Sequence, residues 1–167
     1  MKISLKLCLA VVALAFFGAA IGMFGLSFLD QVTSGTRDSV TTSWGTGFDI
    51  FKSENLDAGN KLGTIFAFVF ICIGALAACY AVFYALTAKK SKKSKGNAKL
   101  ICAFCTFVVC ALVPAILLFL TKQTTGVELE INAGIFGGTK TTLGIGAILA
   151  AVFSVLGGVS LSAAELR

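Results

Sequence analysis

Every charged residue of this chain lies outside four long intervals. The 14 Lys and Arg and the 8 Asp and Glu leave residues 7–29, 62–88, 100–121 and 141–164 without a charge. About 20 helical residues cross the hydrocarbon core of a bilayer, and in lipid the backbone groups of a single segment can pair only as a helix. Each interval therefore predicts a membrane-spanning helix. With 57% apolar and 13% charged residues, the composition excludes an ordinary water-soluble enzyme.

The predicted fold class is an all-α membrane protein, a four-transmembrane-helix bundle with a small extracellular β-cap, in a single membrane domain over residues 1–167. The first interval could also be a cleavable signal peptide, but its apolar run exceeds the 7–15 residues typical of one, so we expect an uncleaved helix.

The charges of the connecting segments predict the orientation. The N-terminus, the short loop 89–99 and the C-terminus carry nine basic residues and one acidic residue, whereas loops 30–61 and 122–140 carry five basic and seven acidic residues. The positive-inside rule then predicts a cell-membrane protein with both termini in the cytoplasm.

The two longer loops carry β-strand patterns. In the first, residues 39–44 are rich in β-branched side chains, and the aromatic segment 48–51 follows a glycine-containing turn. In the second, residues 127–131 alternate between apolar and acidic side chains. These segments predict the strands of the β-cap. Trp44, Phe48 and Phe51 are candidates for an outer contact surface, although packing of these aromatic side chains onto the bundle is favoured.

Small residues recur at every fourth position in the predicted spans, which indicates close packing of helices. The candidate helix-packing residues are Gly18, Gly22, Gly74, Ala78, Gly146, Ala150, Ser154 and Gly158. The same stripe could serve an oligomer interface or receive the helix of another membrane protein. Pro114 removes the helical hydrogen bond to the carbonyl of Cys110 and predicts a bend in the outer half of the third span.

No catalytic, cofactor or metal site is predicted. Cys102 and Cys105 have the spacing of a redox pair, but the outer loops contain no Cys and the chain contains no His. We expect six buried, unreactive thiols, with lipid attachment at Cys8 or Cys102 as the alternative. The spans also contain no Asp, Glu, Lys, Arg or His, which disfavours ion-coupled transport.

The inner loop predicts contact with anionic lipid head groups, because closely spaced ammonium groups face an anionic leaflet. The residues concerned are Lys89, Lys90, Lys92, Lys93 and Lys95. No nucleic acid is expected as a partner, since neither an aromatic residue nor Arg interleaves these lysines.

Three features together carry a family resemblance: residues 43–51 (SWGTGFDIF), the Lys-rich turn, and a last span that begins LGIGAI at Leu143 and contains Gly157 and Gly158. In this pattern the chain resembles uncharacterised small four-helix membrane proteins of Gram-positive bacteria, a resemblance that implies no activity. Its layout is also similar to the claudin-like tetraspan group, although Trp44 lacks the two cysteines that follow the tryptophan motif there.

We expect a non-enzymatic structural or accessory membrane component, or alternatively an oligomeric passive channel or holin-like pore. The expected partners are membrane lipids, with another membrane protein or a second copy of this chain as further candidates.

Overall fold

The computed structural model describes residues 5–26, 29–34, 39–43, 46–52, 58–87, 96–124 and 138–166. The elements in chain order are α1 (Leu5–Met23), β1 (Leu29–Ser34), β2 (Ser39–Ser43), α2 (Gly47–Lys52), α3 (Ala58–Thr87), α4 (Gly96–Phe107), the π-helix η1 (Val108–Leu112), α5 (Val113–Thr124), β3 (Gly138–Leu143) and α6 (Ile145–Leu166).

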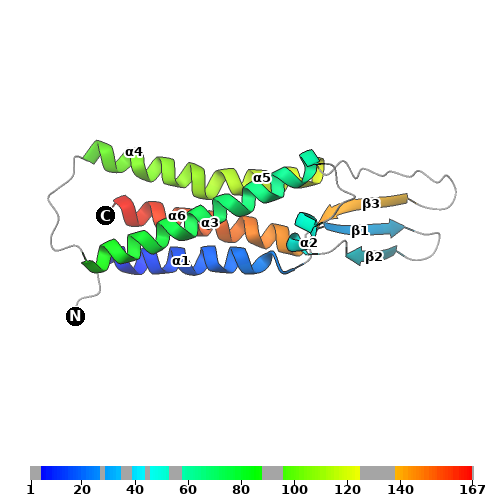
Figure 1. Cartoon of the computed structure of the whole chain (residues 1–167), viewed down its shortest axis with the longest axis horizontal. Helices are drawn as coiled ribbons and strands as arrows, with labels where there is room; N and C mark the ends of the chain where they lie inside the picture. Colours follow the sequence, from blue (N-terminus) through cyan, green and yellow to red (C-terminus); the bar gives the residue numbers. More distant parts are fainter. Residues whose placement is uncertain are drawn as a thin grey trace.

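Four helices are long and apolar enough to cross a membrane, as the charge-free intervals predict: α1, most of α3, the continuous rod of α4, η1 and α5, and α6. They run side by side, and the start of α1 and the end of α6 lie at the same end of the bundle, which we call the terminal end (Figure 1). The sheet lies at the opposite end. Two predicted helix limits are wrong. The first helix ends at Met23 rather than at residue 29, and the last begins at Ile145 rather than at 141, because Leu29 and residues 141–143 join the sheet.

The third span is irregular next to Pro114, where the sequence predicts a bend. The irregularity lies just before the proline, where Val108–Leu112 form a π-helix and the backbone N–H of Val113 donates to the carbonyl of Val108. Proline has no N–H and its ring crowds the preceding turn, and a wider turn relieves that crowding. The span therefore continues through Pro114 as one rod.

The bundle is packed on small side chains, and its large ones face outward. Among the described residues, Ala10, Ala13 and Ala20 of α1 are completely buried, whereas Leu76 and Tyr80 of α3 are each 69% exposed. In water so much exposed apolar surface would drive aggregation, but in lipid it costs nothing, and small residues let helix backbones approach closely. This distribution is that of a membrane bundle.

Some large side chains depart from this pattern and are fully buried, namely Phe17, Phe24, Ile71, Leu118 and Leu161. Phe17 is the one that contacts glycines on two other helices. It lies where α1 meets α3 and α6: a Cβ added to Gly74 would come within 2.6 Å of the ring, and one added to Gly157 within 3.1 Å. A Cβ added to Gly158 would meet the Cβ of Ala111 at 2.5 Å. The absence of side chains at these glycines is what allows the four rods to touch.

The sheet has three strands in the order β2-β1-β3, and both pairs are antiparallel. In the first pair Asp30 lies opposite Ser43, and in the second Leu29 lies opposite Leu143. Only β2 coincides with a predicted strand, residues 39–44. The other two strands escaped prediction because Leu29 continues the apolar run of the first span and β3 is dominated by Thr and Gly rather than by alternation. The predicted strand at 127–131 lies outside the described residues.

The predicted strand over residues 48–51 is wrong, because this segment is part of helix α2. Thr46 caps the helix: the Asp49 carboxylate accepts hydrogen bonds from the Thr46 N–H at 2.9 Å and from the Thr46 hydroxyl at 2.8 Å. The Asp49 N–H donates back to the hydroxyl at 3.3 Å. This reciprocal arrangement satisfies the first free N–H groups of a helix, and here it outweighs the β-propensity of the aromatic residues.

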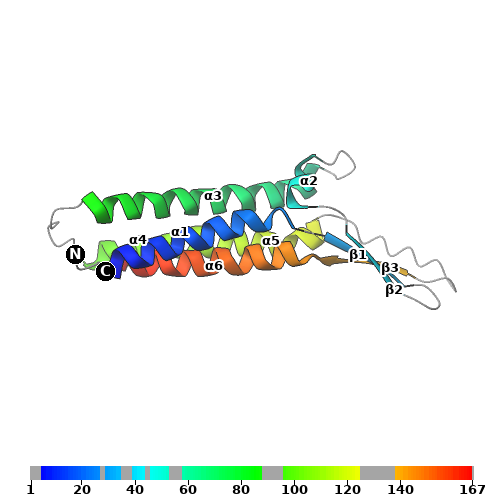
Figure 2. The same ribbon diagram turned by 90° about the horizontal axis from the view of Figure 1, so that it is seen from below.

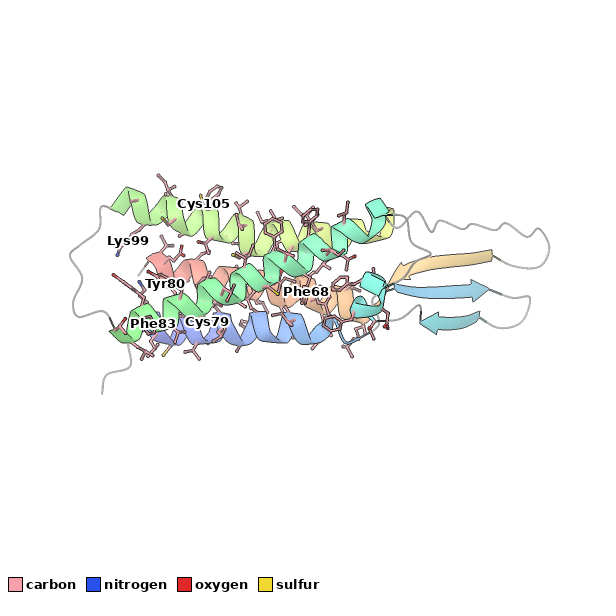
Figure 3. The ribbon with its side chains drawn as sticks, in the orientation of Figure 1. Phe68, Cys79, Tyr80, Phe83, Lys99 and Cys105 are labelled. Atoms are coloured by element: carbon pink, nitrogen blue, oxygen red, sulfur yellow. The ribbon has the colours of Figure 1, made fainter. Side chains whose placement is uncertain are left out.

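At the sheet end, helix α2 packs onto the bundle through a cluster of four phenylalanine rings. Phe24 follows α1, Phe48 and Phe51 come from α2, and Phe68 belongs to α3 (Figure 3). The Phe68 ring lies 4.9 Å from Phe24, 5.9 Å from Phe48 and 5.6 Å from Phe51, in edge-on orientations that aromatic pairs favour. Phe48 and Phe51 therefore pack onto the bundle, and Trp44 lies outside the described residues.

Candidate functional site: a charged pocket where the bundle opens

The four spans are not equally close along their length. Helix α1 packs along α6 and α3, and α3 also meets α5 towards the sheet end. In Figure 1 α3 and α4 lie apart at the terminal end, whereas α3 crosses α5 towards the sheet end. Figure 2 shows α3 along one side of the bundle and α6 along the opposite side.

A pocket of about 270 Å³ lies at the terminal end. Three helices line it: α1 with Lys6, α4 with Ala98, Lys99 and Cys102, and α6 with Glu165. A fourth helix borders it through Tyr84 of α3, since the Lys6 ammonium lies 5.4 Å from the centre of that ring. A cation over an aromatic face is attracted to it, and the contact places Lys6 beside α3.

A hydrogen bond from a residue of α4 holds Glu165 at the side of the pocket. The Thr106 hydroxyl lies 3.0 Å from both oxygens of the Glu165 carboxylate and donates to them, and the contact is half-buried. A hydrogen bond to a charged acceptor is stronger than one between neutral groups. It joins α4 to α6 and leaves the carboxylate beside two lysines.

Lys99, in the first turn of α4, is the second lysine that lines the pocket. Its side chain is directed towards the side on which the other helices lie (Figure 3). Within the described part of the chain no hydrogen bond or ion pair engages its ammonium group. The pocket therefore presents two ammonium groups and one carboxylate at the end of an otherwise apolar bundle.

Sequence reasoning missed this site because it counted Lys6, Lys99 and Glu165 as flanking charges outside the spans. At the terminal end the helices extend further than the charge-free intervals, so Lys6 lies in the first turn of α1 and Glu165 in the last turn of α6. A signal was present in α4, where Lys99, Cys102 and Thr106 follow at spacings of three and four and so share one helical face. Their partners on α1 and α6 carry no comparable pattern.

The predicted helix-packing residues divide into two groups. Gly74, Ala78, Gly146, Ala150, Ser154 and Gly158 are all buried between helices. Gly18 and Gly22 are exposed, and a Cβ added to either would have no atom within 4 Å, so they do not form the packing face of α1. That face is formed instead by Ala10, Ala13, Phe17 and Ala20.

The expectation of six buried thiols is wrong. All six cysteines are free, but Cys8, Cys79, Cys102 and Cys105 are exposed and only Cys110 is fully buried. Figure 3 shows Cys79 and Cys105 on two different helices. A thiol is weakly polar and can face lipid at little cost, which removes the pressure to bury it.

The loop lysines predicted to contact head groups lie outside the described residues. They are Lys89, Lys90, Lys92, Lys93 and Lys95.

Together the four spans, their outward-facing apolar side chains and the charged pocket at one end define the architecture of a multi-pass membrane protein. No protein-family model matches the chain, and no curated protein matches it either. The resemblance to small four-helix membrane proteins of Gram-positive bacteria stays a prediction.

Proposed function

We propose that the protein is a non-enzymatic structural or accessory component of the cell membrane. The observation that carries this proposal is the filled interior of the bundle. Phe17 fills the space against Gly74 and Gly157, and Gly158 lies directly on Ala111. Such packing leaves no polar path between the described parts of the four spans, and a single copy of the chain is therefore a poor conduit for solutes.

The hydroxyl groups inside the bundle also favour a structural role. Ser154 donates to the carbonyl of Ala151 at 3.2 Å, and Ser162 donates to that of Gly158 at 2.8 Å. A hydroxyl bonded to its own helix is satisfied without a ligand. Thr106 is likewise engaged by Glu165. These groups therefore stabilise the helices and have no catalytic partner, which supports the assignment as a protein other than an enzyme.

In the proposed orientation both termini and the charged pocket face the cytoplasm, and the sheet faces outward. The support is the excess of basic residues at the terminal end, which the positive-inside rule assigns to the cytoplasmic side. The outer sheet and the apolar helix faces would then be available to another membrane protein or to a second copy of this chain.

Affinity purification of the full chain in mild detergent, followed by mass spectrometry, tests the accessory role. We expect a membrane protein to co-purify in a constant ratio. A parallel measurement of dye release from vesicles containing the purified protein addresses the pore. Recovery of the protein alone and monomeric would contradict the proposal, and so would leakage that increases with the amount of protein.

A further inference from the structure

We propose that the charged pocket at the terminal end binds the head group of a phospholipid that carries both a phosphate and a primary amine, as phosphatidylethanolamine does. The first step is the chemistry of the lining. Lys6 and Lys99 supply two ammonium groups, and Glu165 supplies one carboxylate, around a space of about 270 Å³. A phosphate between the two lysines and an ammonium group on the carboxylate would pair all three charges of the pocket.

The second step is the depth of the pocket. Lys6 lies in the first turn of α1, Lys99 in the first turn of α4 and Glu165 in the last turn of α6. Three spans thus begin or end at one level, and the ends of spans lie where a bilayer places its head groups. The ligand that meets this pocket at high local concentration is a lipid rather than a dissolved metabolite.

The third step is access from the bilayer. The pocket is open rather than enclosed, and α3 and α4 lie apart at this end of the bundle (Figure 1). The helices beside it expose apolar side chains, among them Tyr80 and Phe83 of α3 and Leu100 of α4. Acyl chains attached to a head group in the pocket could lie against these side chains and would not have to enter the packed interior.

The Glu165 carboxylate determines which phospholipid binds most tightly. A purely anionic head group would satisfy the lysines but would be repelled by Glu165, which Thr106 holds in place. A choline head group has a phosphate, but its quaternary nitrogen has no N–H to donate to the carboxylate. A primary ammonium donates directly, and a hydrogen bond between two charged groups is the strongest kind available here.

Native mass spectrometry of the full chain in mild detergent tests this site. The probes are phosphatidylethanolamine, phosphatidylglycerol and phosphatidylcholine with identical acyl chains, and we expect phosphatidylethanolamine to bind most tightly. Lys99→Gln should weaken binding of all three lipids by roughly five-fold, as should Lys6→Gln, because each removes one ammonium group near the phosphate. Glu165→Gln should reduce the affinity for phosphatidylethanolamine to that for phosphatidylcholine and leave phosphatidylglycerol equal or tighter.

The matched control is the pair Lys122→Gln and Lys140→Gln, which removes two positive charges from α5 and β3 at the sheet end and should leave the lipid preference unchanged. Glu165→Gln keeps an oxygen that Thr106 can donate to, and the thermal unfolding of each variant shows whether the bundle is intact. Lys99 lies on α4 and Glu165 on α6, so the Lys99→Gln variant gives a second, independent readout. Soluble phosphoethanolamine is added as a competitor, and we expect it to displace the lipid poorly.

Equal binding of the three lipids by the unaltered chain would overturn the proposal, as would unchanged affinity in both lysine variants. Full displacement by phosphoethanolamine would assign the pocket to a dissolved ligand and would also overturn it. None of these outcomes depends on the presence of a protein companion, so the lipid site and the accessory role fail separately.

Discussion

Thr106 of α4 and Glu165 of α6 are joined by a hydrogen bond in which the hydroxyl lies 3.0 Å from both carboxylate oxygens. The two residues are 59 positions apart in the chain and belong to two different spans. Their contact fixes the register of two spans at the terminal end and shapes one wall of the charged pocket. It also suggests the simplest test of the fold at that end.

Replacing Thr106 by Val should lower the stability of the bundle. The isosteric change removes the donor and leaves a half-buried carboxylate without its partner, at a cost of about 1–2 kcal/mol in a membrane protein. Thermal unfolding in detergent, followed by circular dichroism, measures the difference. Thr106→Ser retains the hydroxyl and is the control. A Val variant as stable as the unaltered chain would mean that the bond contributes nothing.

Gly158→Ala should destabilise the contact between α6 and η1. The added Cβ would lie 2.5 Å from the Cβ of Ala111 and 3.0 Å from its backbone nitrogen, so the two helices must move apart. Overpacking of this kind costs roughly 1–3 kcal/mol. Gly18→Ala is the matched control, because a Cβ there meets no atom within 4 Å, and it should unfold at the same temperature as the unaltered chain. Equal stability of the two variants would refute the assigned packing.

Gly74→Ala and Phe17→Leu should compensate one another. The alanine Cβ would come within 2.6 Å of the buried Phe17 ring, and the smaller leucine would relieve that contact. Each single change should destabilise the bundle, whereas the double variant should lose less than the two losses added together, with a coupling of about 0.5–3 kcal/mol. Unfolding of all four proteins in one detergent gives the cycle. Strict additivity would show that the ring and the glycine are not in contact.

Phe68→Ala should loosen the junction between α3 and α2. Its ring contacts Phe24, Phe48 and Phe51, so truncation removes three aromatic contacts at once, and up to about 3–5 kcal/mol is lost when a buried Phe is truncated. Hydrogen exchange in α2 should become faster. Phe66→Ala is the control, because that side chain is 50% exposed on the same helix and faces the surroundings. Faster exchange in both variants would point to a general loosening of α3 instead.

Thiol labelling of whole cells should distinguish the two ends of the bundle. In a chain whose six cysteines are replaced by alanine, a cysteine introduced at Ser39 of β2 should react with a membrane-impermeant reagent, and one at Ser91 in the lysine loop should not. The reason is the excess of positive charge at the terminal end, which is retained in the cytoplasm. Labelling at Ser91 alone would invert the proposed orientation.

The spans were predictable because their signal is local and strong, whereas the helix limits were not. Lys6 and Glu165 belong to terminal helical turns, although their charges place them outside the apolar intervals. Helix α2 was mistaken for a strand because its aromatic residues favour strands, and only the capping contacts between Thr46 and Asp49 reveal the helix. β1 was hidden because its first residue, Leu29, continues the apolar run of the first span.

The role of the small residues was likewise predictable in some helices and not in others. Their four-residue spacing indicated close packing in α3 and α6, where the glycines do lie against Phe17 and Ala111. In α1 the same spacing at Gly18 and Gly22 marked an exposed side, because the packing face of that helix is formed by alanines. Spacing identifies a face of a helix, but it does not identify which neighbour that face meets.

The sequence by itself determined that four apolar helices are present, that the polar segments between them alternate from one end of the bundle to the other, and that positive charge gathers at one end. These properties follow from the free energy of placing each segment in lipid or water, which is a sum over neighbouring residues. The tertiary structure decided that Lys6, Lys99 and Glu165 share a pocket, that Thr106 holds Glu165, and that Phe17 fills the space left by two glycines. These contacts depend on how rigid helices pack against one another, and that packing joins residues from opposite ends of the chain.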